Sequence, residues 1–188
     1  MSDTLIQSYS EVNVDYDYGS ASLDPTSGVN SSRDGLAFAL PASPIYTLTS
    51  IKLYLKKFGL PTGTARVVLR AATGAIESAV PTGAELAGVD FDISTLTTAY
   101  ALYEFIFTTP YLSTAGITYT CYLRNPTAGT IDASNYPILG MKNLGGNGIN
   151  QVRNDTSAEN WIPNSRSPAY YLYGKPPASG GAFLLNFI

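Results

Sequence analysis

Apolar and polar residues alternate along four segments of the chain, residues 45–58, 64–71, 101–107 and 117–124. Because successive side chains of a β-strand point to opposite faces, this period of two predicts four strands, each with one buried and one solvent-facing side. The side chains predicted to face the core are Ile51, Leu53, Leu55, Ala65, Val67, Leu69, Ala71, Tyr103, Phe105, Phe107, Ile117, Tyr119, Cys121 and Leu123. Those predicted to face water are Lys52, Tyr54, Lys56, Arg66, Arg70, Glu104, Thr118, Thr120, Tyr122 and Arg124.

Glycine and proline separate these segments from one another. The sequence at 59–63, GLPTG, lies between two of the predicted strands and is typical of a hairpin-type connection. No segment has the apolar spacing of an amphipathic helix, and the best helical candidate, residues 93–98, predicts one loose turn. Many short strands joined by turns predict an all-β fold. We expect an antiparallel two-sheet β-sandwich, jelly-roll-like, with very little helix and an extended C-terminal segment.

The chain has 188 residues, which suits a single domain. We expect residues 1–175 to form the sandwich domain, with an irregular, turn-rich N-terminal region over residues 8–34. Glycine- and asparagine-rich stretches between residues 140 and 168 predict long loops. Residues 176–188 have the composition of a Pro/Gly linker followed by an apolar strand.

Composition narrows the possible chemistry. The chain has no His and one Cys, which excludes a Ser-His-Asp triad, a Cys-His pair, a His-ligated metal and an internal disulfide. Charged residues make up 13% of the chain and the net charge is −3, so the basic surface that nucleic-acid binding needs is missing. We therefore expect a protein that is not an enzyme, has no cofactor and does not bind nucleic acid.

The sequence also suggests where the protein is made and used. Its first residues lack the basic and apolar regions of a secretory signal, and no apolar run reaches 18 residues. We expect a protein that is made in the cytoplasm without a signal peptide, does not insert into a membrane, and reaches a virion or the extracellular space by release. Cys121 alternates with apolar residues, which predicts a buried structural thiol.

Two groups of carboxylates are candidate sites. Asp15 and Asp17 stand in a loop-rich DYDYG sequence that resembles part of a calcium loop, although the full ligand spacing is missing. Calcium binding there is the weaker interpretation and a solvated acidic loop the stronger one. Asp90 and Asp92, two positions apart on a predicted strand, would face the same side, but no partner group for glycoside chemistry can be named. An exposed strand face is the simpler interpretation.

The aromatic residues near the C-terminal end are candidates for ligand binding. Trp161 lies in a polar sequence, and Tyr171 and Tyr173 share one face of a predicted strand. Such rings stack on sugars and are also common at protein interfaces. The alternative is structural: Trp161 folds back as a core residue and the tyrosines pack on their own sheet. The sequence favours this structural interpretation and leaves both binding interpretations open.

The last seven residues are the most unusual segment, because six of them are apolar and they follow a flexible spacer. If such an apolar strand stayed exposed to solvent, it would promote aggregation or association with other chains. It can complete its own sandwich, or it can add to a neighbouring subunit. The interface residues predicted here are Phe183, Leu184, Leu185, Phe187 and Ile188.

A series of short motifs follows in a fixed order between residues 37 and 174: AFA at 37–39, YTLTSIKLYL at 46–55, KFGLPTGT at 57–64, residues 103–108, LSTAGITY at 112–119, Trp161 and residues 170–174. This order resembles the jelly-roll domains of prokaryotic surface proteins and phage structural proteins, including the "choice-of-anchor" type. What the resemblance implies is a non-catalytic role in adhesion, sugar contact or virion architecture.

Together these observations predict a non-enzymatic structural or assembly protein, a phage virion surface component of the capsid-decoration or tail/fibre kind. Its expected partners are other copies of itself and other virion proteins. The alternative is a carbohydrate- or receptor-binding β-sandwich module that contacts host-surface glycans through Trp161, Tyr171 and Tyr173.

Overall fold

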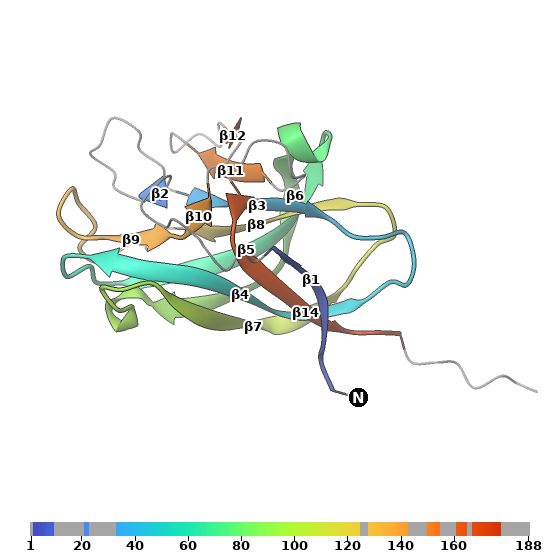
Figure 1. The fold of residues 1–188 in the computed structure, drawn as a ribbon, viewed down its shortest axis with the longest axis horizontal. Coiled ribbons are helices and arrows are strands. Elements are labelled where there is room, and N and C mark those ends of the chain that lie inside the picture. The colour runs from blue at the N-terminus through green and yellow to red at the C-terminus, as the bar shows by residue number, and fades with distance from the viewer. Residues whose placement is uncertain are drawn as a thin grey trace, which may run out of the picture.

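The computed structural model describes residues 2–9, 21–22, 33–124, 128–142, 150–154, 161–164 and 167–177. Within these ranges the protein consists mainly of β-strands, arranged as two six-stranded antiparallel sheets beside a short two-stranded ribbon (Figure 1). Helix in the same ranges is confined to two 3-10 turns, η1 (Ile76–Ser78) and η2 (Ile93–Thr95). The predicted all-β, two-sheet sandwich is therefore confirmed.

The first sheet is organised around its long central strand, β4 (Thr47–Phe58). β7 (Ala101–Leu112) pairs along one side of β4. β14 (Tyr170–Lys175) and β9 (Tyr136–Leu139) follow each other end to end along the other side. The strands outside them are β1 (Thr4–Tyr9), next to β14, and β2 (Ala21–Ser22), next to β9.

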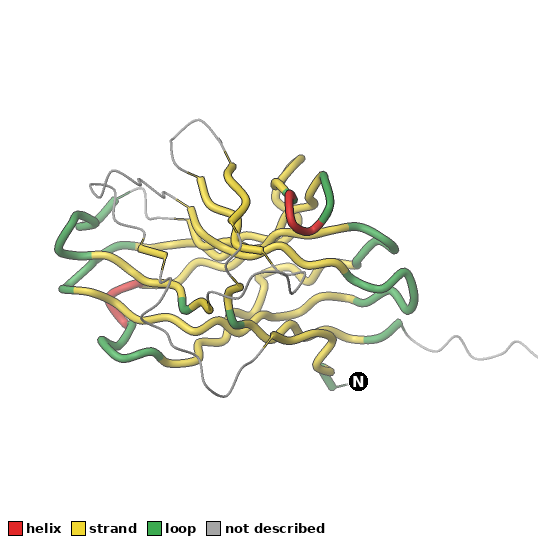
Figure 2. Tube along the Cα trace, turned by 45° about the horizontal axis from the view of Figure 1, so that its top comes forward, coloured by secondary structure: helices red, strands yellow, loops and turns green. Residues whose placement is uncertain are grey.

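The second sheet packs across the core from the first. Its strand order is β12 (Trp161–Asn164), β11 (Asn150–Asn154), β3 (Arg33–Ala39), β8 (Thr118–Arg124), β5 (Thr64–Thr73) and β6 (Val80–Asp92). The ribbon pairs β10 (Met141–Lys142) with β13 (Ser167–Pro168). Figure 2 shows the long strands of both sheets running along the length of the molecule, with loops at both of its ends.

The hydrophobic core lies between the two sheets and follows the alternation of the sequence. The predicted inward positions on β4, and Phe105 and Phe107 on β7, are buried, while Tyr103 and Ile117 pack against the core from partly buried positions. The largest fully buried side chains are Tyr119, Tyr170, Phe38, Leu36, Leu48, Ile51, Leu53, Leu55, Leu69, Ile93 and Leu96. Burying side chains of this size contributes roughly 1.5–3 kcal/mol each, which makes this interface the main source of stability.

One predicted solvent face is wrong. Thr120 and Tyr122 on β8 are 0% and 2% exposed, although the alternation placed them toward water. β8 is an interior strand of its sheet, and its second face carries a small apolar layer in which the Tyr122 ring lies 4.8 Å from that of Trp161. When both faces of a strand are covered, the alternate residues on the second face are buried too, so alternation in the sequence no longer predicts which residues face water.

Two predictions of irregular structure are also partly wrong. Residues 140–168 were expected to be loops, yet they contain β10, β11, β12 and β13. Residues 8–34 were expected to be irregular, yet β1 reaches Tyr9, Ala21–Ser22 forms β2 and β3 begins at Arg33. These strands are short or polar, and their place in a sheet depends on partners far away in the sequence, such as β3 for β11.

Candidate functional site

The outer face of the first sheet is the solvent-facing side of β1, β14, β4 and β7. Tyr171 and Tyr173 belong to it, because the alternate residues Tyr170 and Leu172 are buried in the core. Both tyrosines are partly buried. Cross-strand register aligns one row of side chains across the four strands, in the order Leu5, Tyr173, Ser50, Ile106. A second row runs through Ser8, Tyr171, Lys52 and Glu104.

A small polar network connects the centre of this face. The Lys52 ammonium lies 4.8 Å from the centroid of the Tyr173 ring, and Lys52 Nζ lies 3.7 Å from Glu104 Oε2. The Ser50 hydroxyl donates a hydrogen bond of 3.1 Å to Glu104 Oε1. Ion pairs and cation–π contacts at exposed positions are worth about 1 kcal/mol or less each, so this network orients side chains more than it stabilises the fold.

Several large apolar side chains stay exposed on the same face. Ile106 is 67% exposed, Leu112 56%, Leu5 47% and Leu102 41%. Three of them belong to β7, and single exposed apolar residues are ordinary whereas a row of them on one strand is not. We call Leu102, Ile106 and Leu112 the β7 edge residues. Sequence alternation does not single them out as site residues, although apolar residues at positions that alternate with Tyr103, Phe105 and Phe107 are a visible signal.

Trp161 occupies the opposite side of the molecule, on β12. It packs against Ala37 and Ala79, its ring lies 4.8 Å from that of Tyr122, and the Arg33 guanidinium lies 5.9 Å from its centroid. The indole nitrogen is buried and has no hydrogen-bond partner within the described residues. Trp161 is therefore remote from Tyr171 and Tyr173, and it packs in a small cluster outside the main core.

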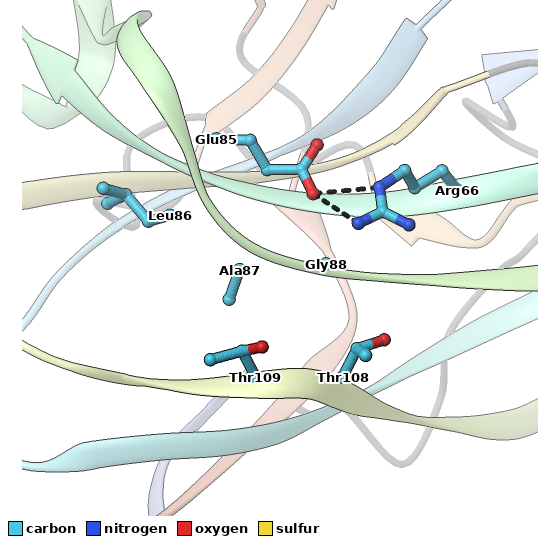
Figure 3. Close-up of a pocket in the computed structure, with 7 residues that line it drawn as sticks. All are labelled: Arg66, Glu85, Leu86, Ala87, Gly88, Thr108 and Thr109. Atoms are coloured by element: carbon cyan, nitrogen blue, oxygen red, sulfur yellow. Dashed lines mark hydrogen bonds and ion pairs between the residues drawn. The ribbon is translucent and has the colours of Figure 1, made fainter.

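A shallow hollow of about 220 Å³ lies between the edges of the two sheets, where β6 passes β7 (Figure 3). Arg66 is held there by Glu85, with 2.6 Å between Arg66 Nη2 and Glu85 Oε1, and by Asp90 at 2.7 Å. Hydrogen bonds from these two carboxylates, that of Glu85 foremost, raise the pKa of Arg66 further above its usual value. The hollow is lined by Arg66, Glu85, Leu86, Ala87, Gly88, Thr108 and Thr109. It is smaller than the roughly 300–1,000 Å³ of typical ligand pockets.

Asp90 and Asp92 each have a local partner. Asp90 pairs with Arg66, and Asp92 accepts a hydrogen bond of 2.8 Å from the Ser94 backbone at the start of η2. Hydrogen bonding to Ser94 lowers the pKa of the fully exposed Asp92. Structural pairing and turn capping account for both carboxylates.

Cys121 is buried between the sheets, and burial raises the pKa of its thiol. It has the structural character predicted from its alternation, because a neutral, covered thiol is a poor nucleophile.

Other predicted site residues lie outside the described residues. These are Asp15 and Asp17 of the weak calcium site and Phe183, Leu184, Leu185, Phe187 and Ile188 of the C-terminal interface. Among the residues that are described, no cluster of three or more Asp, Glu, Cys or His side chains has metal-binding geometry. The described part of the chain also contains no helix that is long and apolar enough to span a membrane.

Comparison with family models, with curated proteins and with solved structures finds no match for this chain. The outer face of the first sheet is thus the candidate site on physical grounds alone. It combines exposed apolar side chains with tyrosine rings, a residue type enriched at protein interfaces, and it also carries a lysine–glutamate pair.

Proposed function

We propose that this chain is a non-enzymatic structural protein that acts by assembling with other copies of itself. The observation that carries the proposal is the β7 edge, where Leu102, Ile106 and Leu112 stay exposed on a strand at the border of its sheet. Natural proteins usually protect such borders with charge or cover them, since an apolar border strand is a template for association. Subunit contact supplies that cover.

The biological setting that we propose is a phage virion surface, as a capsid-decoration or tail/fibre component. This part rests on the sequence resemblance to jelly-roll surface domains and on the low charge of the chain, 13% of residues. The other virion proteins are then its further partners, and neither a cofactor nor nucleic acid is required.

The test is the mass of the native protein by sedimentation equilibrium across a wide concentration range. We expect an oligomer, and we expect Ile106→Lys to weaken it because the substitution places a charge in the apolar contact. Leu60→Lys is the matched control: Leu60 is 76% exposed, but it lies in the turn between β4 and β5. A chain that stays monomeric at every concentration would overturn the proposal.

A second candidate function is glycan binding by the outer face. It is favoured by the Tyr173 ring beside Lys52 and Glu104, because a sugar is recognised by an aromatic face together with polar groups. Trp161 does not contribute, since its ring is packed against Tyr122. Glycan-array binding that is lost in Tyr173→Ala and kept in Trp161→Phe would favour this function over assembly.

A further inference from the structure

We infer that the C-terminal segment, residues 182–188, of one copy adds as an antiparallel strand to β7 of another copy. This inference rests on the proposed assembly function and names the contact that carries it.

The acceptor is the open side of β7. Within the described residues β7 pairs with β4 along one side only, so the backbone N–H and C=O groups on its other side have no strand partner there. Alternate side chains, Leu102 and Ile106, are apolar and exposed beside this open border. Glu104 between them is engaged by Lys52 and Ser50, which leaves it less able to repel an incoming strand. Strand addition at such a border is a common way of binding an extended segment.

The donor has the matching chemistry. Residues 182–188, AFLLNFI, carry no charged side chain, and apolar side chains occupy both alternating sets of positions. Seven residues extended at roughly 3.3 Å each are about 23 Å long, which equals the length of the regular stretch 101–107 of β7. One set of apolar side chains can therefore lie against Leu102 and Ile106 over the full stretch.

The donor cannot pair with β14, the strand that precedes it. β14 already has β1 on one side and β4 on the other. The short stretch that follows β14, residues 176–177, runs on beyond the end of the strand (Figure 1) and is a Pro-Pro pair. A Pro-Pro pair is stiff and extended, so it carries the chain outward toward residue 178.

Reach decides which copy receives the strand. Lys175 aligns with Thr47, and Thr47 with Leu112, so the donor leaves its own copy at the end of the sheet where β7 finishes. Within one copy, the path from Pro177 to a position beside Phe107 crosses three strand spacings, about 14 Å, and returns about 14 Å along the sheet, or about 20 Å in all. The five steps from 177 to 182 span at most about 18 Å. The strand therefore falls short of this position on its own β7, which leaves β7 of a neighbouring copy to receive it.

The experiment separates donor from acceptor with full-length variants. Ile106→Lys impairs the acceptor, the double variant Leu185→Asp, Phe187→Asp impairs the donor, and Leu60→Lys is the control at an exposed apolar position elsewhere. Masses and dissociation constants are measured by sedimentation. We expect the control to match the parent and each impaired variant to raise the dissociation constant about 30-fold or more, as loss of a central interface residue does. Mixing the two impaired variants should restore a complex, because one supplies an intact donor and the other an intact acceptor.

Three outcomes would overturn the inference. If both impaired variants keep the mass of an oligomeric parent, assembly uses another surface, and the proposed function survives without strand donation. If the parent is monomeric and the donor variant unfolds at a lower urea concentration, the segment belongs to its own sandwich. If the parent is monomeric and neither variant changes anything, both the inference and the proposed function fail.

Discussion

Tyr119 and Tyr170 offer a matched pair of substitutions that tests how the core handles polar atoms. Both residues are fully buried, and Phe38 lies 5.9 Å from each ring. The Tyr119 hydroxyl accepts a hydrogen bond of 2.6 Å from the Thr114 backbone N–H. The Tyr170 hydroxyl is covered and has no hydrogen-bond partner within the described residues. The same substitution, Tyr to Phe, therefore removes a hydrogen-bonded hydroxyl at Tyr119 and a buried hydroxyl without a hydrogen bond at Tyr170.

The expected energies have opposite signs. Tyr119→Phe loses both hydrogen bonds of the Tyr119 hydroxyl to the Thr114 backbone and leaves the Thr114 N–H unpaired, which costs about 1–2 kcal/mol of the free energy of unfolding. Tyr170→Phe removes an oxygen whose desolvation is not compensated, so it should leave stability unchanged or raise it by up to about 1 kcal/mol. The ring contacts with Phe38 persist in both variants. The difference between the two variants should be about 2 kcal/mol, which exceeds the error of a denaturation experiment.

Urea denaturation at neutral pH, followed by tryptophan fluorescence, measures both variants against the parent. The comparison is valid when the dependence of the free energy on urea is the same for the three proteins. A Tyr170→Phe variant that is destabilised as much as Tyr119→Phe would refute the reasoning, because the Tyr170 hydroxyl would then have to make a bond of equal value.

Three further predictions concern stability. Burial raises the pKa of the Cys121 thiol, so the thiol of the unfolded chain loses its proton first as pH rises. The free energy of unfolding should therefore fall by about 1.4 kcal/mol per pH unit above about pH 8.5 through this group. Urea titrations of Cys121→Ala should lack this part of the pH dependence. Gly35→Ala should lower the free energy of unfolding by more than about 2 kcal/mol in urea denaturation, because a Cβ there would lie 2.1 Å from the Cys121 carbonyl oxygen. A Cβ at Gly83 would meet no atom within 4 Å, so Gly83→Ala should lower it by only about 1 kcal/mol, through the positive φ of that residue. Equal losses in the two variants would contradict this account. Trp161→Ala should lower the thermal midpoint, with a loss of about 2 kcal/mol from its contact with Tyr122, and an unchanged midpoint would instead favour a ligand-facing Trp161.

The parts of the fold that the sequence predicts well are those where one face of a strand is buried and the other is wet. β4 is the clearest example, since Leu53 is buried between the outward-facing Lys52 and Tyr54. Prediction fails where both faces of a strand are buried, as at Tyr122 on β8, because no face of the strand is then left to solvent. It also fails for β11, which has a polar sequence and takes its place through pairing with β3.

The candidate site was predictable only in part. Tyr171 and Tyr173 follow from the alternation of their strand, and the structure places both on the outer face. Leu102 and Ile106 are visible in the sequence as apolar residues, but their exposure depends on β7 lying at the border of the sheet, which no local pattern determines. The separation of Trp161 from the tyrosines likewise depends on the pairing of β11 with β12 and β3.

The end-to-end arrangement of β14 and β9 along β4 has a consequence for synthesis on the ribosome. Three strands pair with β4 in the described part of the chain, and none of them is its neighbour in sequence. The first to be made is β7, more than 40 residues later, and the last is β14, about 110 residues later. At a synthesis rate of roughly 5–20 residues per second, β4 therefore has no partner strand on either side for several seconds. Lys52, Lys56 and Lys57 break its apolar run, and lysines so placed discourage a waiting strand from joining the same strand of another nascent chain.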